Sequence, residues 1–306
     1  MKILVVNEKS LFYDYYKKKG IGVAIYKSIT SEYLRAFRRV HLTMRLPFFS
    51  VWYTKEFRQV SPKETKEVVI FDSMLSVKPA NYLRKKYTDL RIIYWHWNHI
   101  DIPFFFKSFD TGIERWSYDT IDCEQYKMRF NTQFYIADFA NSNNLPIERD
   151  CFFIGAVKTR GPYIEKCRDA LEAAGLDSLF ILSDNTRKDR ERKWVEYHDI
   201  LNYIKTSRCV IDIVPDTQYG MTLRPLEALF LKKKLITNYK DIIKSDFYHR
   251  DNIFILDVDD ISRLYEFVKS PFNDVVSQYA PYYDMWTWLE RFTIGEKLKI
   301  NNNESD

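Results

Sequence analysis

The sequence predicts an α/β protein with largely parallel sheets, and two observations support this fold class. Apolar segments of strand length alternate with segments of helical periodicity along the chain, which is the pattern of βαβ units. The alternation stops at a polar stretch, residues 140–146, and then begins again. The sequence therefore predicts two α/β halves joined by a linker, with a cleft between them at the carboxyl ends of the strands.

The first half contains short apolar runs that end at polar residues. A helix is expected where Pro79 opens a periodic segment, because proline suits the first turn of a helix. The predicted strands are residues 3–7, 67–71 and 91–95, and the predicted helices are residues 22–40, interrupted near Thr30 and Ser31, and 79–87.

The second half repeats the alternation more regularly. Gly175 follows a periodic segment and marks the end of its helix. The predicted strands are residues 151–154, 179–182, 209–214, 234–237 and 253–256, and the predicted helices are residues 163–174, 197–206, 223–230, 261–268 and 284–292.

These elements predict four parts of the chain. Residues 1–147 form an N-terminal Rossmann-like domain, and residues 148–280 form a C-terminal Rossmann-like domain. Residues 281–296, rich in aromatics, form a helix that packs back toward the N-terminal domain. Residues 297–306 are polar and are expected to be a disordered tail.

The composition excludes several other classes of protein. Apolar residues make up 46% of the 306 residues and charged residues 29%, which is normal for a globular protein. The chain has no run of about 18 uncharged apolar residues, and its first apolar stretch is too short for a signal peptide. The four cysteines are scattered without a Cys-x-x-Cys pair, which argues against a zinc or disulfide scaffold and predicts a reducing cytoplasm.

Residues 209–237 are the most informative stretch of the sequence. A buried strand leads into a loop with Gly220, and a helix follows in which Arg224 and Glu227 share one face. Unpaired backbone N–H groups and the helix dipole favour an anion at such a helix start. The arginine can bind phosphate and the glutamate can accept from ribose hydroxyls. The alternative is a simple surface ion pair between the two side chains.

Glycine is scarce, with 8 in the chain, so a glycine that ends a predicted strand indicates a backbone constraint. Gly155 is such a residue, and Lys158 and Arg160 follow it, where they can offset diphosphate charge or form a solvated loop. Asp216 follows the strand at residues 209–214 and is expected in the ligand loop, whereas Asp212 within the strand is expected to support that loop.

Two segments resemble the donor domain of GT-B glycosyltransferases, and more narrowly the CgeB-like and lipopolysaccharide-type bacterial transferases that build surface polysaccharides. The first is Phe-Phe-Ile-Gly-Ala-Val-Lys-Thr-Arg at residues 152–160. The second is Gln-Tyr-Gly-Met-Thr-Leu-Arg-Pro-Leu-Glu-Ala at residues 218–228, followed by Lys-Lys-Lys-Leu-Ile-Thr, which ends at residue 237.

The resemblance implies a GT-B fold of two Rossmann-like domains that face each other across a cleft. Residues 1–147 would then lie on the acceptor side, residues 148–280 would bind the nucleotide sugar, and particular residues would have donor roles. The Glu-x7-Glu pattern of the retaining families is absent, because the residue eight before Glu227 is Tyr219 and the one seven before it is Gly220, so a retaining mechanism of that type is in doubt. In the family, the glycine loop and helix start hold the diphosphate and the acidic residue holds the ribose. Those roles fall on Gly220, Met221, Thr222, Arg224 and Glu227.

An inverting transferase needs a base that takes the proton of the acceptor hydroxyl. The resemblance implies that this base lies in the N-terminal domain at the carboxyl end of a strand, where the sequence has Asp72, His96, His99 and Asp101. His96 is the first choice because histidine titrates near neutrality, and Asp72 is the second. The alternative for His96 is a buried core histidine between two tryptophans.

The sequence predicts neither a metal nor a resident cofactor. Asp257 and Asp259 form an Asp-x-Asp, which holds a metal in GT-A transferases, but they precede a predicted helix and, with Asp260, fit its cap and first turn. Gly20-Ile-Gly22 lacks the third glycine of a dinucleotide fingerprint and predicts at most a loop near the acceptor or donor phosphate.

Basic charge is concentrated at the N-terminus. Residues 1–60 contain 12 Lys and Arg against 4 Asp and Glu, a net charge of +8, whereas the whole chain carries +5. These cations alternate with aromatic residues, a pattern that fits an anionic membrane surface or a solvated face above ordinary core aromatics. Nucleic-acid binding is not expected, because no recognition motif accompanies the charges.

The function predicted from these features is transfer of a sugar from a nucleotide-sugar donor to a saccharide or lipid-linked acceptor in bacterial surface polysaccharide synthesis. The product would be lipopolysaccharide, capsule or O-antigen, and the enzyme would be cytoplasmic, at the inner face of the membrane. The alternatives are a non-catalytic nucleotide-sugar or glycan-binding relative and another nucleotide-dependent transferase.

Overall fold

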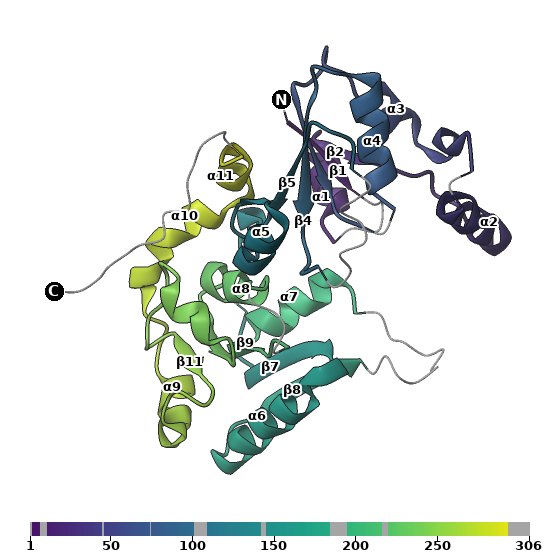
Figure 1. Cartoon of the computed structure of the whole chain (residues 1–306). Coiled ribbons are helices and arrows are strands. Elements are labelled where there is room, and N and C mark those ends of the chain that lie inside the picture. Colours follow the sequence, from purple (N-terminus) through teal and green to yellow (C-terminus); the bar gives the residue numbers. More distant parts are fainter. Residues whose placement is uncertain are drawn as a thin grey trace. The chain divides into compact units, whose positions relative to one another are not determined.

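The computed structural model describes residues 2–6, 11–44, 46–73, 75–100, 109–141, 145–183, 195–215 and 220–292, except for the side chains of residues 43 and 158. The chain divides into two compact units, Met1–Asn131 and Thr132–Asp306, and Figure 1 shows the parallel strands of each. The first unit thus ends earlier than residue 147, where the sequence placed the boundary.

Unit 1 contains a parallel sheet with the strand order β2-β1-β3-β4-β5-β6 among the described residues. Its central strands are nearly continuous runs of buried apolar residues, as expected for parallel strands covered on both faces. The strands are β1 (Lys2–Val6), β2 (Gly22–Ala24), β3 (Glu67–Phe71), β4 (Arg91–His96), β5 (Ile113–Ser117) and β6 (Arg129–Phe130).

Three helices of unit 1 begin at residues whose side chains cap them. Ser31, Thr54 and Asp119 each accept a hydrogen bond from a backbone N–H in the first turn of α2, α3 and α5. The α-helices are α1 (Tyr13–Lys18), α2 (Glu32–Thr43), α3 (Lys55–Gln59), α4 (Val77–Lys86) and α5 (Thr120–Tyr126), and a 3₁₀ helix, η1 (Phe49–Trp52), follows α2.

The predicted helix over residues 22–40 is wrong in its first part. Gly22–Ala24 is the edge strand β2, which pairs parallel to β1, and the helix α2 begins only after Ser31. Gly22 lies against α1, where an added Cβ would approach the backbone nitrogen of Lys17 to 2.6 Å. This close contact explains the glycine by packing, without a ligand.

Unit 2 contains a second parallel sheet with the order β11-β10-β9-β7-β8 among the described residues. The strand order reverses between β7 and β9, which are neighbours although β8 lies between them in the sequence. The strands are β7 (Arg149–Ala156), β8 (Ser178–Ser183), β9 (Ser207–Asp212), β10 (Lys234–Thr237) and β11 (Ile253–Ile255).

The helices of unit 2 follow the predicted order. No helix in the described part of the chain is both long and apolar enough to cross a membrane. The α-helices are α6 (Gly161–Ala173), α7 (Tyr197–Lys205), α8 (Arg224–Phe230), α9 (Leu264–Lys269), α10 (Ala280–Tyr283) and α11 (Met285–Glu290), and the 3₁₀ helices used below are η4 (Lys158–Arg160) and η6 (Ile261–Arg263).

The segment after Asn131 belongs to unit 2 through contacts with α10 and α11. The backbone of Tyr135 hydrogen-bonds to Tyr283 and Met285 at 2.9 and 2.8 Å, and the ring of Phe134 lies 4.1 Å from that of Trp288. These contacts account for the position of the division. Packing of residues 281–296 toward the N-terminal domain stays a prediction.

Candidate functional site

The reversal of strand order in unit 2 defines a candidate site. Open parallel α/β sheets bind ligands beyond the carboxyl ends of their strands at such a switch point. Here these are the ends of β7 and β9. The loop after β7 carries Arg160, and the loop after β9 leads to Gly220 and the start of α8.

Arg160 connects the ends of the two strands. Its Nη1 donates to the carbonyl oxygen of Ile213 at 2.7 Å, and its Nε donates to the carbonyl oxygen of Ala156 at 3.0 Å. Burial lowers the pKa of Arg160, and the nearby carboxylate of Asp212 partly offsets this. A guanidinium stays charged under such conditions, so the switch point holds a fixed positive charge.

Gly155 makes room for this arginine. A Cβ at residue 155 would lie 2.9 Å from Nη2 of Arg160 and 3.2 Å from Cζ of Phe153. The sequence associated Gly155 directly with the diphosphate. The structure shows that the missing side chain leaves space for the Arg160 guanidinium.

Asp212 supports the loop before α8. The hydroxyl of Thr222 donates to Oδ2 of Asp212 at 2.9 Å and accepts the backbone N–H of Arg224 at 3.2 Å. Burial raises the pKa of Asp212, while Arg224 and Arg160 oppose that rise. The carboxylate therefore lies close to both arginines, in the supporting role expected from its place in the strand.

Arg224 and Glu227 form a buried pair on α8. Glu227 is 2% exposed, and Arg224 donates to its Oε2 through Nη1. Oε1 of Glu227 accepts from the hydroxyl of Tyr197 at 2.9 Å, so both carboxylate oxygens are engaged. The sequence left open a simple surface ion pair between Arg224 and Glu227, but the two side chains are only 16% and 2% exposed. In this conformation Glu227 orients Arg224. A ribose hydroxyl could bind the carboxylate of Glu227 only by displacing Tyr197 or Arg224 from it.

The remaining predicted donor residues differ in how far they are buried, and two of them are not fully described by the structure. Gly220 is buried, and Met221 is half-buried and packs against the core that contains Leu226. Asp216 and the side chain of Lys158 lie outside the described residues.

Asp72 directly follows β3, at the switch point of unit 1 between β1 and β3. Its Oδ1 accepts the backbone N–H of Trp97 at 3.0 Å. Burial raises the pKa of Asp72 to about 7, against the opposing effect of hydrogen bonds from the backbone of Trp97 and Asn98. The carboxylate can therefore exchange a proton near neutral pH.

His96 is the last residue of β4 and is buried. Burial and the positive charge of Arg115 lower the pKa of His96 to about 3. Its imidazole is neutral at physiological pH and is a much weaker base than an ordinary histidine. The structure thus gives the two base candidates very different proton affinities.

A third group in unit 1 joins His99 to two aspartates that the sequence did not single out. Nδ1 of His99 lies 3.2 Å from Oδ1 of Asp122 and 3.5 Å from Oδ2 of Asp119. The N-cap pattern at Asp119, before Thr120 and Ile121, was the available signal, but α5 was not among the predicted helices.

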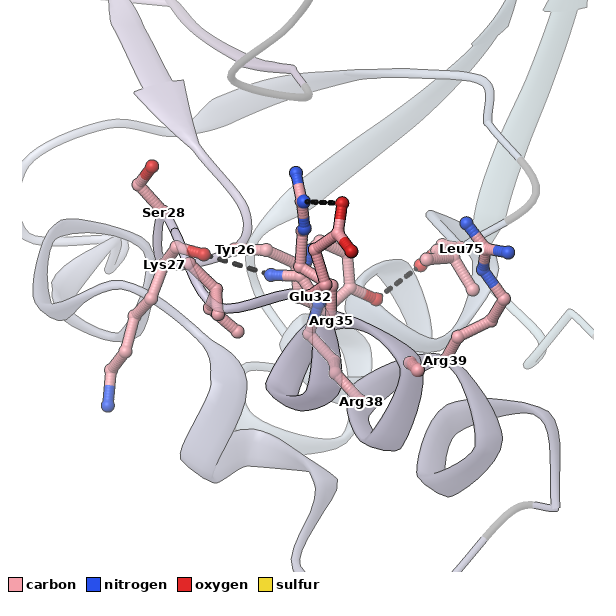
Figure 2. A pocket seen from close by; sticks show the side chains of 10 residues that line it. Tyr26, Lys27, Ser28, Glu32, Arg35, Arg38, Arg39 and Leu75 are labelled. Atoms are coloured by element: carbon pink, nitrogen blue, oxygen red, sulfur yellow. Dashed lines mark hydrogen bonds and ion pairs between the residues drawn. The ribbon is translucent and has the colours of Figure 1, made fainter. Parts of the chain in front are cut away.

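The basic N-terminal region forms a pocket of about 440 Å³ between α2 and the loop after β2 (Figure 2). Arg38 donates to the carbonyl oxygen of Lys27 at 2.9 Å and lies 5.4 Å from the ring centre of Tyr26. Within the described residues, neither the Lys27 ammonium nor the Arg39 guanidinium forms an ion pair. The charged lining residues are Lys27, Glu32, Arg35, Arg38 and Arg39.

The same helix exposes an apolar stripe. Tyr33 and Phe37, one turn apart on α2, are 89% and 58% exposed, and Val40 and Met44 continue the stripe along the helix. Figure 1 shows α2 set apart from the sheet of unit 1. Leu42 is the one buried side chain of α2 among those described.

The Asp-x-Asp segment forms a turn and a cap. Oδ2 of Asp259 accepts the backbone N–H of Ile255 at 2.6 Å, and Asp260 caps η6 by accepting from Ser262 at 3.0 Å. Asp257 forms an ion pair with Lys166.

Two parallel α/β units, with six and five strands in their described parts, form the GT-B fold, a glycosyltransferase-type fold, as the sequence resemblance implied.

HepE of Anabaena in complex with UDP-glucose is similar to this chain at a TM-score of 0.52 and 8% identity, over 95% of this chain and 97% of that one. Its complex with UDP and glucose gives 0.50 and 7% over the same shares. Sucrose-phosphate synthase of Thermosynechococcus elongatus gives 0.50 and 10%, over 94% and 96%. No protein-family model and no curated protein matches the sequence.

Proposed function

We propose that this chain is a glycosyltransferase of the CgeB-like or lipopolysaccharide type. It moves a sugar from a nucleotide-sugar donor to a saccharide or lipid-linked acceptor of a bacterial surface polysaccharide. The observation that carries the proposal is the presence of two arginines, Arg160 and Arg224, at the switch point of unit 2. A nucleoside diphosphate carries its charge on the phosphates, and this position is where parallel sheets hold such groups. The donor complexes of HepE, on the same fold, are consistent with this assignment.

The two arginines have different roles in the proposed donor site. Arg160 donates its N–H groups to the backbone carbonyl oxygens of Ala156 and Ile213, and so contributes a positive charge at a fixed position. Among the described residues, Arg224 donates through Nη1 alone, so its remaining N–H groups are available for phosphate oxygens. The backbone of Gly220, Met221 and Thr222 is proposed to complete the phosphate contacts. Lys158 and Asp216 remain donor-site candidates from the sequence alone.

The leaving diphosphate is then stabilised by arginine charges, and donor binding is proposed to need neither a metal nor a resident cofactor. A nucleotide sugar acts as co-substrate. We assign the base to Asp72 rather than to His96, because its pKa of about 7 suits proton transfer at neutral pH and a pKa of about 3 does not.

The acceptor side of the proposal rests on α2. Its exposed Tyr33 and Phe37, beside the cationic pocket around Arg35 and Arg39, match an interface of anionic headgroups and acyl chains. We therefore place the enzyme in the cytoplasm, peripherally at the inner face of the membrane, where a lipid-linked acceptor is available.

Donor binding and turnover are tested together. A panel of nucleotides and nucleotide sugars is screened by thermal shift, because a ligand that binds only the folded state raises the melting temperature. Release of free nucleotide is then followed with the ligands that bind. Slow hydrolysis of one nucleotide sugar supports the proposal, and binding without turnover, with acceptors present, indicates a non-catalytic relative.

The matched control for the donor site is an arginine in a similar pair elsewhere. Arg168 forms an i,i+3 ion pair with Glu165 on α6, but this pair is largely exposed. Arg224→Ala is expected to abolish the ligand-induced shift while Arg168→Ala keeps it. Equal shifts in both variants would contradict the placement of the site.

A further inference from the structure

Two buried carboxylates and one imidazole nitrogen converge in unit 1. Asp119 and Asp122 lie at the start of α5, and His99 follows β4 by three residues. The two aspartates are 0% exposed and His99 side-chain exposure is 24%. Among the described residues, Oδ2 of Asp119 and Oδ1 of Asp122 have no partner other than Nδ1 of His99, which lies 3.5 and 3.2 Å away.

The other oxygen of each carboxylate is held by the backbone. Oδ1 of Asp119 accepts from the N–H groups of Ile121 and Asp122 at 2.9 and 3.1 Å, and Oδ2 of Asp122 accepts from Ile100 at 3.1 Å. Each side chain is thus fixed in orientation, and its second oxygen faces the imidazole. Metal-binding carboxylates are usually oriented by such outer hydrogen bonds.

The charges in this cluster do not balance. With both carboxylates ionised, two negative charges lie in a buried position, and within the described residues their one ion-pair partner is His99. In that state even a protonated imidazole would leave one negative charge uncompensated among the described residues, and an uncompensated buried charge is costly. We infer that His99, Asp119 and Asp122 bind a divalent transition-metal ion.

The distances fit this inference. All three ligand atoms lie within 4.8 Å of one another. Ligands about 2.0–2.2 Å from a tetrahedral zinc ion are separated by about 3.3–3.6 Å. The distances of 3.2 and 3.5 Å from the imidazole nitrogen to the two carboxylates agree with that spacing.

The donor atoms also indicate which metal binds. One imidazole nitrogen and two carboxylate oxygens suit Zn²⁺, Mn²⁺ or Fe²⁺ better than Mg²⁺ or Ca²⁺, which prefer oxygen alone. Three protein ligands leave a further coordination position open. The ion would join the segment after β4 to the start of α5, and its binding energy would then stabilise unit 1.

The test measures metal binding directly, with no donor or acceptor present. The full chain is stripped with EDTA, dialysed, and titrated with Zn²⁺ and with Mn²⁺ by calorimetry, and the melting temperature is measured with and without each ion. One equivalent is expected to bind and to raise the melting temperature. Asp122→Asn and His99→Gln are expected to weaken binding at least tenfold, about 1.4 kcal/mol or more.

The control is a capping aspartate of the same kind. Asp119→Asn keeps a cap acceptor for α5 but removes a charge, and Asp260→Asn does the same at η6. The first variant should lose the metal and the second should keep it, and circular dichroism reports whether each is folded. A stripped wild-type chain that binds neither ion, or variants that bind as tightly as wild type, would overturn the inference.

Discussion

The guanidinium of Arg160 donates a 2.7 Å hydrogen bond to the carbonyl oxygen of Ile213, and so links the loop after β7 to the end of β9. These two strands are neighbours in the sheet but are separated in the sequence by α6, β8 and α7. The bond fixes a positive charge at the point where the strand order reverses. The first prediction tests whether the donor site depends on it.

Gly155→Ala is expected to displace Arg160 and to weaken donor binding by about three- to tenfold, the loss of roughly one hydrogen bond. The physical reason is the 2.9 Å approach of an added Cβ to Nη2 of Arg160. Calorimetric titration with the nucleotide sugar measures the effect. Gly161→Ala is the control, because its Cβ would meet Val157 at an ordinary 3.5 Å. If Gly155→Ala binds the nucleotide sugar as tightly as wild type, Arg160 does not contribute to donor binding.

Arg224→Ala is expected to lower both donor affinity and stability. The lost contact with phosphate is worth about 1.5–3 kcal/mol, a factor of about 10 to 100. The stability falls by about 3–5 kcal/mol because Glu227, 2% exposed, loses its charged partner. The double variant Arg224→Ala/Glu227→Gln should recover most of the stability but none of the affinity. Urea unfolding and donor titration of the three proteins measure the two effects separately, and recovery of affinity in the double variant would remove Arg224 from the donor site.

Asp72→Asn is expected to lower kcat by about a hundredfold or more, since a general base contributes about 10²–10⁴. Wild-type kcat/KM should rise with pH through about 7 as Asp72 loses its proton, and this limb should vanish in the variant. The limb is measured as kcat/KM for the acceptor, at saturating donor and subsaturating acceptor, across pH 5–9. If the pH-dependent limb of kcat/KM persists in Asp72→Asn and disappears in His96→Gln, the catalytic base is His96.

The same carboxyl predicts a pH dependence of stability. The pKa of Asp72 is raised from 3.8 to about 7 in the folded protein, so the folded state binds the proton more tightly than the unfolded state. The contribution of Asp72 to the free energy of unfolding is therefore greatest at low pH and declines as pH rises from about 4 to about 7. Relative to wild type, Asp72→Asn should become more stable over that range, as measured by urea unfolding at several pH values. A constant difference between the two proteins would contradict the raised pKa.

Removing the apolar stripe of α2 is expected to weaken vesicle binding. Tyr33→Ser/Phe37→Ser should reduce co-sedimentation with phosphatidylglycerol vesicles by about tenfold or more, because each exposed ring buries apolar area in the interface. Arg35→Gln/Arg39→Gln should act similarly, at about 1 kcal/mol for each charge, and its effect should shrink in high salt. Tyr265→Ser, at a tyrosine that is 53% exposed on α9, is the control. Equal binding by all these proteins would exclude α2 as a membrane contact.

Much of the fold could be predicted because strand and helix patterns are local. The strands β3 and β10 match their predicted bounds, and the predicted elements of unit 2 occur in the predicted order, although α10 was not predicted. The elements missed in unit 1 include β5 and α5 as well as the shorter α1 and β2. Helix α1 has six residues, and β2 has three and is stabilised by pairing with β1 and by the contact of Gly22 with α1. Such elements depend on neighbours that no local pattern reveals.

The site divides in the same way. The motif around Gly220, Arg224 and Glu227 was visible because residue type and spacing place the two charged side chains on one helical face. The engagement of Glu227 by Tyr197, from a helix about 30 residues earlier in the chain, was not visible. The two base candidates, Asp72 and His96, looked alike as polar residues at strand ends. Burial separates their pKa values, and burial is a property of the packed unit.

By itself, the sequence determined the α/β class, the division into two α/β units and the residues at the ends of the strands, because periodicity and strand length act over a few residues. The GT-B fold was implied by the resemblance of two segments to a known family. Only the tertiary structure decided what those residues contact. It placed Arg160 on Ile213, buried Glu227 beneath Arg224, and brought His99 to Asp119 and Asp122. These contacts join residues from different elements, and the order of strands in the sheet determines which elements meet.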